Sequence, residues 1–169
     1  MTVTPNGPRN PSFILRVEEA VQAVFAAGGG KTTRGFVELK AVKQKKSVLL
    51  VGIDPVVIDF SSPDFAPQNL SADRVMSALL ADNERLRGLG YEADLCLTDL
   101  GETAERVVEE KLRAKAYDCV LIGAGIRVIP SSFLLFEKLI NVVHANAPQA
   151  KLCFNTKPSD TAEAVMRWV

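Results

Sequence analysis

Polar and glycine residues follow four short apolar runs in the sequence after residue 46, and these residues have the chemistry to bind a ligand. The candidate ligand-binding residues are Asp54, Gly123, Gly125, Arg127, Asn155 and Lys157. Glycine lets a ligand approach the backbone closely, and arginine binds a carboxylate or phosphate through two parallel hydrogen bonds. These residue types predict a site for a small anionic ligand.

Asp54 and Asp99 are the candidates for catalysis, because two carboxylates can act as general acid and general base. Arg127 or Lys157 would then stabilise negative charge that develops during the reaction. Near these residues the sequence shows neither a nucleophile paired with a base nor a histidine. An enzyme is therefore the alternative to a binding module.

The cysteines and the single histidine do not predict a metal site. Cys96, Cys119 and Cys153 are far apart, lie beside apolar residues and have no second cysteine or histidine at metal-ligand spacing. They are expected to be small core residues. His144 lies in an apolar helical run, where a structural role is expected.

Four buried strands are predicted to position the candidate residues. Short runs rich in valine and leucine end in glycine or polar residues, as strands buried on both faces do. These runs span residues 46–54, 92–98, 118–123 and 150–155.

A helical pattern follows each predicted strand. The first helix, at residues 71–90, is expected to bury an apolar face: Val75, Met76, Leu79, Leu80 and Leu86. Capping-box spacings open the second helix at Asp99 and the last at Asp160, and the third begins near Pro130. In the last helix, Trp168 is expected to pack on the sheet.

The regular alternation of strand and helix predicts an α/β protein with helices on both faces of a parallel sheet. Right-handed crossovers make 2-1-3-4 the most economical strand order. The predicted fold class is thus a three-layer doubly wound sandwich with a flavodoxin-like four-stranded sheet, preceded by an N-terminal amphipathic helix. In such a sheet ligands bind beyond the carboxyl ends of the strands, where the strand order reverses. The candidate residues are expected to gather there, between the first and third strands.

Two glycine-rich segments depart from nucleotide-binding motifs, so no cofactor is assigned. In GGGKTT, at residues 28–33, the glycine that a phosphate-binding loop needs is replaced by Phe25. Val128 stands where a dinucleotide fingerprint on Gly123 and Gly125 needs a third glycine. The loop after the first strand carries acids and prolines instead of the hydroxyl groups typical of a flavin site.

The chain divides by charge into a basic leader, residues 1–46, and an α/β domain, residues 47–169. The leader holds eight basic and three acidic residues, a net charge of +5, which leaves 12 basic and 17 acidic residues, or −5, in the domain. Apolar residues recur at helical spacing within residues 13–27, and this amphipathic helix is expected to cover an edge of the sheet or mediate homo-oligomerisation. The net charge of zero for the whole chain argues against nucleic acid as a partner.

No segment predicts a membrane partner. No run approaches the roughly 20 apolar residues of a membrane-spanning helix. The N-terminus has no charged region followed directly by an apolar signal core. A cytoplasmic location is expected.

Four segments carry a resemblance: VGIDP, DLGETAE, LIGAGIR and FNTKPSDTAEA. Over about residues 47–169 the chain resembles small uncharacterised bacterial proteins of Rossmann-like type, a resemblance that implies no activity. It more distantly resembles response-regulator receiver domains, since Asp54 and Lys157 match their acidic and lysine positions. Gly123 and Gly125 stand where the receiver phosphoacceptor belongs, so aspartyl phosphorylation is not expected.

The sequence favours a small-molecule or anion-binding domain with its site at the carboxyl ends of the strands. One alternative is an enzyme that uses Asp54 and Asp99 as acid and base. Another is a receiver-like protein-interaction module that works without phosphorylation.

Overall fold

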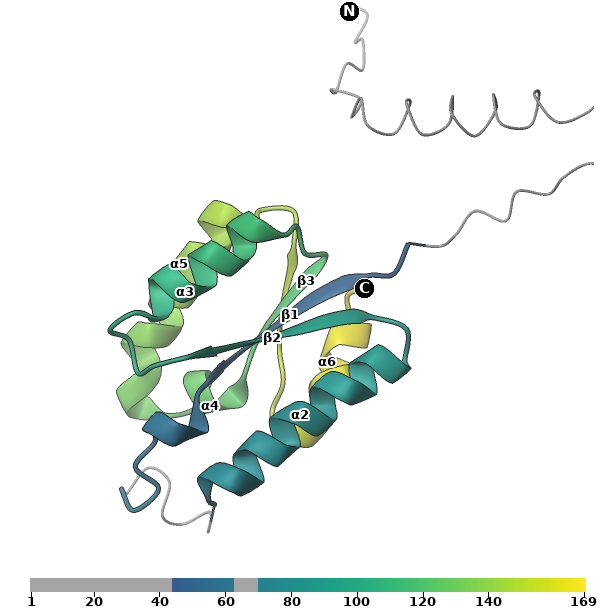
Figure 1. The fold of residues 1–169 in the computed structure, drawn as a ribbon. Helices are drawn as coiled ribbons and strands as arrows, with labels where there is room; N and C mark the ends of the chain where they lie inside the picture. The colour runs from purple at the N-terminus through teal and green to yellow at the C-terminus, as the bar shows by residue number, and fades with distance from the viewer. Residues whose placement is uncertain (1–43, 63–69) are drawn as a thin grey trace, which may run out of the picture. The chain divides into compact units, whose positions relative to one another are not determined.

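The computed structural model describes residues 44–62 and 70–169 (Figure 1). The predicted amphipathic helix at residues 13–27, and with it the expected homo-oligomerisation, lies outside the described residues. Most of the basic leader also lies outside them.

A four-stranded parallel sheet forms the centre of the described part, with the order β2-β1-β3-β4. The strands are β1 (Ser47–Ile53), β2 (Glu92–Thr98), β3 (Cys119–Ile122) and β4 (Lys151–Phe154). Each neighbouring pair is parallel. This confirms the predicted class and strand order, and the order reverses between β1 and β3.

Helices cover both faces of the sheet, with α3 and α5 on one face and α2 and α6 on the other (Figure 1). The α-helices are α2 (Ala72–Gly88), α3 (Ala104–Ala114), α4 (Ala124–Arg127), α5 (Phe133–Asn146) and α6 (Thr161–Met166). Short 3-10 turns precede or link them: η1 (Pro55–Val57), η3 (Pro130–Ser132) and η4 (Pro158–Asp160). Within the described residues, none of the helices has the length and apolar character that crossing a bilayer requires.

Strand β1 is buried along its whole length, which accounts for its continuous apolar run. Leu49 and Val51 face the core cluster under α3 and α5, whereas Val48 and Leu50 face the cluster under α2 and α6. Burying one such side chain stabilises a fold by about 1.5–3 kcal/mol. The central strand therefore joins the two core layers.

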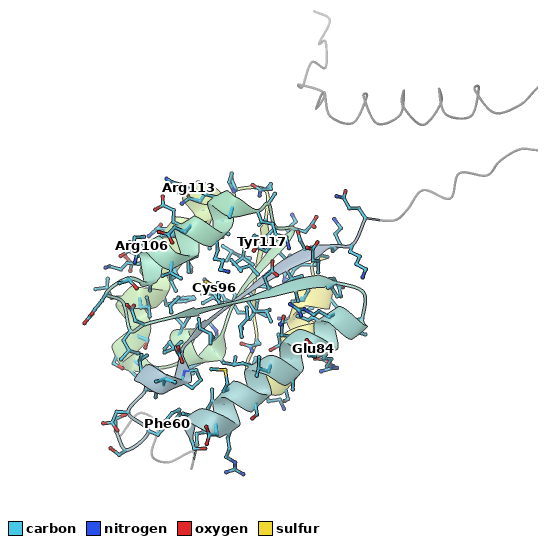
Figure 2. All side chains as sticks on the ribbon, in the orientation of Figure 1. Phe60, Glu84, Cys96, Arg106, Arg113 and Tyr117 are labelled. Carbon is cyan, nitrogen blue, oxygen red and sulfur yellow. The ribbon has the colours of Figure 1, made fainter. Side chains whose placement is uncertain are left out.

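All three cysteines are buried core residues, as the sequence predicts. Cys96 belongs to the cluster under α3, close to Tyr117 (Figure 2). Burial raises the pKa of the Cys96 thiol to about 11, so it stays protonated at neutral pH. Cys119 and Cys153 lie in the opposite cluster, with their sulfur atoms 3.4 Å apart.

Two of the predicted core positions are wrong. Trp168 is 56% exposed, because α6 ends at Met166 and its Val165 side chain packs on the sheet instead. Leu80 is 50% exposed. Leu79 faces inward and lines the cavity that is described below. Because successive helix residues point about 100° apart, Leu80 is turned away from that side.

Candidate functional site

A cavity of about 410 Å³ lies at the carboxyl edge of the sheet, between α2 and the ends of β1 and β3. This is the edge where the strand order reverses. Its walls are mainly apolar and include Ile53 from β1, Leu79 from α2 and Ile129 after α4. Phe60 also lines it and lies beside the first turns of α2 (Figure 2). The volume lies within the range of small-molecule sites, about 300–1,000 Å³.

Asp82 brings a carboxylate into the wall of this apolar cavity. Val75 and Leu79 precede it along the cavity-facing side of α2, and Leu86 follows in the core. The spacings of four, three and four residues place all of these on one side of a helix. Asp82 therefore occupies a position where the helical pattern would place an apolar residue.

A chain of hydrogen bonds fixes Asp82 and joins three helices and the residue after β4 around the cavity. Thr161, at the start of α6, donates its hydroxyl proton to Asp82 Oδ2 at 2.6 Å. The amide nitrogen of Asn155 donates to Thr161 Oγ1 at 3.0 Å, and the backbone N–H of Ala124 donates to Asn155 Oδ1 at 2.8 Å. Each member of the chain lines the cavity, so this network makes one wall rigid.

The surroundings of Asp82 disfavour its ionised form. Burial raises the pKa of Asp82, and the nearby negative charges of Asp160 and Glu163 act in the same direction. The hydrogen bond from Thr161 and the positive charge of Arg85 partly oppose this rise in pKa. Arg85 is itself paired with Glu163.

Gly123 and Gly125, both predicted from the sequence, line the cavity. The Gly123 N–H donates to the Val51 carbonyl at 2.9 Å, and a Cβ on Gly123 would lie 3.2 Å from the same oxygen. A side chain on Gly123 would thus crowd the backbone of β1. A Cβ on Gly125 would meet nothing within 4 Å, so open space adjoins this residue.

Asn155 and Lys157 also line the cavity, one buried and one exposed. Asn155 follows β4 and is 5% exposed.

Asp160 shapes the next turn by accepting hydrogen bonds from the backbone N–H groups of Thr156 and Lys157. The predicted capping role of Asp160 differs from this, because its carboxylate points back to the loop and not to the backbone of α6.

Arg127 lies outside the cavity lining. Its guanidinium donates to the Asn155 carbonyl oxygen at 3.0 Å. Its Nε is buried and has no hydrogen-bond partner among the described residues. The side chain thus supports the end of β4, and anion binding by Arg127 stays a prediction.

Asp54 directly follows β1 and Asp99 directly follows β2, and the carboxylate of each accepts hydrogen bonds within the turn after its strand. Asp54 accepts from the Val56 N–H at 3.0 Å and opens η1. Asp99 accepts from the backbone N–H groups of Gly101, Thr103 and Ala104, with Gly101 contributing most to lowering its pKa. Neither carboxylate lines the cavity. Their catalytic roles stay predictions.

Asp82 and Thr161 were not among the residues predicted from the sequence. The sequence did carry a signal for Asp82, because a carboxylate on the apolar side of a helix breaks the pattern that a core requires. For Thr161 the sequence carried no signal beyond its place at a helix start. Arg74, which also lines the cavity, lies in the exposed first turn of α2 and was equally unmarked.

The described residues contain no group of three or more histidine, cysteine, aspartate or glutamate side chains arranged to hold a metal ion. No protein-family model, curated protein or solved structure matches this chain. The fold and the cavity together define a three-layer α/β protein with a largely apolar cavity at the carboxyl edge of its sheet.

Proposed function

We propose that this chain is a small-molecule-binding module and that its ligand occupies the cavity beside α2. The observation that carries the proposal is a cavity of about 410 Å³ with apolar walls at the reversal point of the strand order. Open doubly wound sheets bind their ligands at this point. Four of the residues singled out in the sequence line it: Gly123, Gly125, Asn155 and Lys157.

The composition of the walls favours a ligand with an apolar body. Leu79, Ile129 and Phe60 offer apolar surface, and each buried methylene group of a ligand contributes about 0.8 kcal/mol. A small inorganic anion would leave these walls in contact with water. Lys157 and Arg74 are cationic side chains of the lining that could meet an anionic group on the ligand, and both are exposed.

Filling the cavity tests the proposal. Ala78 lines the cavity from α2, whereas Ala81 lies on the exposed side of the same helix. With the neutral fluorophore N-phenyl-1-naphthylamine as probe, the wild-type chain is expected to bind one equivalent saturably. Ala78→Phe should weaken this binding by about tenfold or more, a loss of at least ~1.4 kcal/mol. Ala81→Phe, the same chemical change outside the cavity, should leave it unchanged.

The location of binding is checked on the wild-type chain by amide NMR shifts. Bound probe should shift the backbone N–H signals of Gly123, Gly125 and Thr161 most strongly. The proposal is overturned if the wild-type chain shows no saturable binding, or if Ala78→Phe binds as tightly as Ala81→Phe.

A further inference from the structure

We infer that the cavity selects ligands that carry an ammonium or similar cationic head on an apolar body, with the Asp82 carboxylate as the recognition group. This inference rests on the proposed small-molecule function and names its ligand class. It differs from the anionic ligand that the sequence predicts, because the charged group that the hydrogen-bond network fixes in the wall is itself an anion.

The position of Asp82 makes its carboxylate a recognition group. Its Oδ2 accepts the Thr161 hydroxyl at 2.6 Å, so the side chain is held in one orientation. Among the described residues, that hydroxyl is the group that hydrogen-bonds the Asp82 carboxylate. Its other oxygen therefore keeps the capacity to accept a hydrogen bond from a ligand in the cavity.

The charge of the Asp82 carboxylate also favours a cation. Asp160 and Glu163 act on Asp82 as negative charges, and Arg85 is the positive charge that acts on it. Arg85 is paired with Glu163 and Lys157 acts on Asp160 as a positive charge, so each of these two acids has a cation beside it. The Asp82 carboxylate itself would therefore attract a cationic ligand head and repel a ligand carboxylate.

Lys157, a cation that also lines the cavity, is less suited to fix a ligand. Its side chain is exposed, and a long exposed side chain keeps its charged end hydrated. A ligand anion would have to displace that water and order a flexible side chain. A ligand that binds Asp82 avoids the second of these costs, because Thr161 already holds the side chain.

Three probes with the same eight-carbon chain separate the possible head groups: octylammonium, 1-octanol and octanoate. Each is titrated at pH 7 into the full chain, and amide NMR shifts at the cavity give the dissociation constants. At this pH the amine is protonated, as a lysine side chain is. Octylammonium should bind about tenfold more tightly than octanoate, with 1-octanol between them.

Asp82→Asn removes the charge and keeps the shape of the side chain. It should weaken octylammonium binding by about tenfold and change 1-octanol binding by less than about twofold. Asp73→Asn is the matched control, since Asp73 is an exposed aspartate on the first turn of the same helix. It should leave all three dissociation constants unchanged. Retained 1-octanol binding also reports that the Asp82→Asn variant is folded.

The inference is overturned if wild-type protein binds octanoate as tightly as octylammonium, or if Asp82→Asn binds octylammonium like wild type. Those outcomes leave the proposed function intact, because an apolar chain would still occupy the cavity. If none of the three probes shifts the cavity amides, the proposed function itself fails and the inference fails with it.

Discussion

At the scale of single residues, Asp82 is an acid that the fold holds at a cost. Burial and two neighbouring carboxylates raise its pKa, which means that the folded chain binds a proton at Asp82 more tightly than the unfolded chain does. The ionised form consequently destabilises the folded state at neutral pH. Costly polar groups of this kind concentrate at functional sites, which supports a binding role for Asp82.

The free energy of unfolding of Asp82→Asn tests that cost. The folded-state pKa lies above the ordinary value of 3.8. The destabilisation by the ionised Asp82 carboxylate is therefore absent well below pH 3.8, and it develops as pH rises through the folded-state pKa. Asparagine cannot ionise, so the stability of the variant relative to wild type should be greater at pH 7 than at pH 3. Urea unfolding at both values measures the difference.

The other charges near Asp82, namely Arg85, Asp160 and Glu163, are present in both proteins, so the comparison isolates Asp82 to first order. An equal stability difference at pH 3 and pH 7 would contradict a raised pKa.

At the scale of elements, the turns after the strands decide which side chains reach the cavity. The turn between β2 and α3 holds Gly101 at a φ of +127°, a backbone conformation that favours glycine. Asp99 closes the same turn with three backbone hydrogen bonds. This turn therefore uses the Asp99 carboxylate for structure.

Gly101→Ala should destabilise the chain by about 1–2 kcal/mol, because alanine is strained at positive φ. Gly88→Ala is the matched control: it lies at the end of α2, and a Cβ there meets nothing within 4 Å. Since alanine favours a helix more than glycine does, Gly88→Ala should stabilise by up to about 1 kcal/mol. Urea midpoints measure both changes. Equal effects of the two substitutions would show that the backbone conformation at Gly101 is unimportant.

At the scale of the whole described domain, stability comes from two core layers that share one sheet. β1 contributes to both layers, and Leu49 is 0% exposed within the larger of them. The C-terminal Trp168 is 56% exposed despite its size. The two residues therefore differ sharply in how much apolar surface the fold removes from water.

Leu49→Ala should lower the free energy of unfolding by about 2–5 kcal/mol, the usual cost of a cavity left by a buried leucine. Trp168→Ala should change it by less than about 0.5 kcal/mol. Thermal and urea unfolding check both values. A loss above about 2 kcal/mol for Trp168→Ala would instead support the packing expected from the sequence.

Much of the fold was predictable, while the site was predictable only in part. Strands β1 to β4 were found because short buried apolar runs alternate with helical patterns. Trp168 and Leu80 were misplaced, because the exact end and rotation of a helix depend on its packing. Gly123 and Asn155 were found at the cavity because they directly follow strands, and Asp82 was missed because it lies within a helix.

The sequence by itself determined the α/β class and the strand order, since apolar periodicity is local and crossover handedness leaves few arrangements. The tertiary structure alone decided which polar groups meet at the cavity. Asp82 and Thr161 are 79 residues apart in sequence and 2.6 Å apart in space. Their meeting depends on how α2 and α6 pack on the same face of the sheet, and the local patterns of neither helix specify that packing.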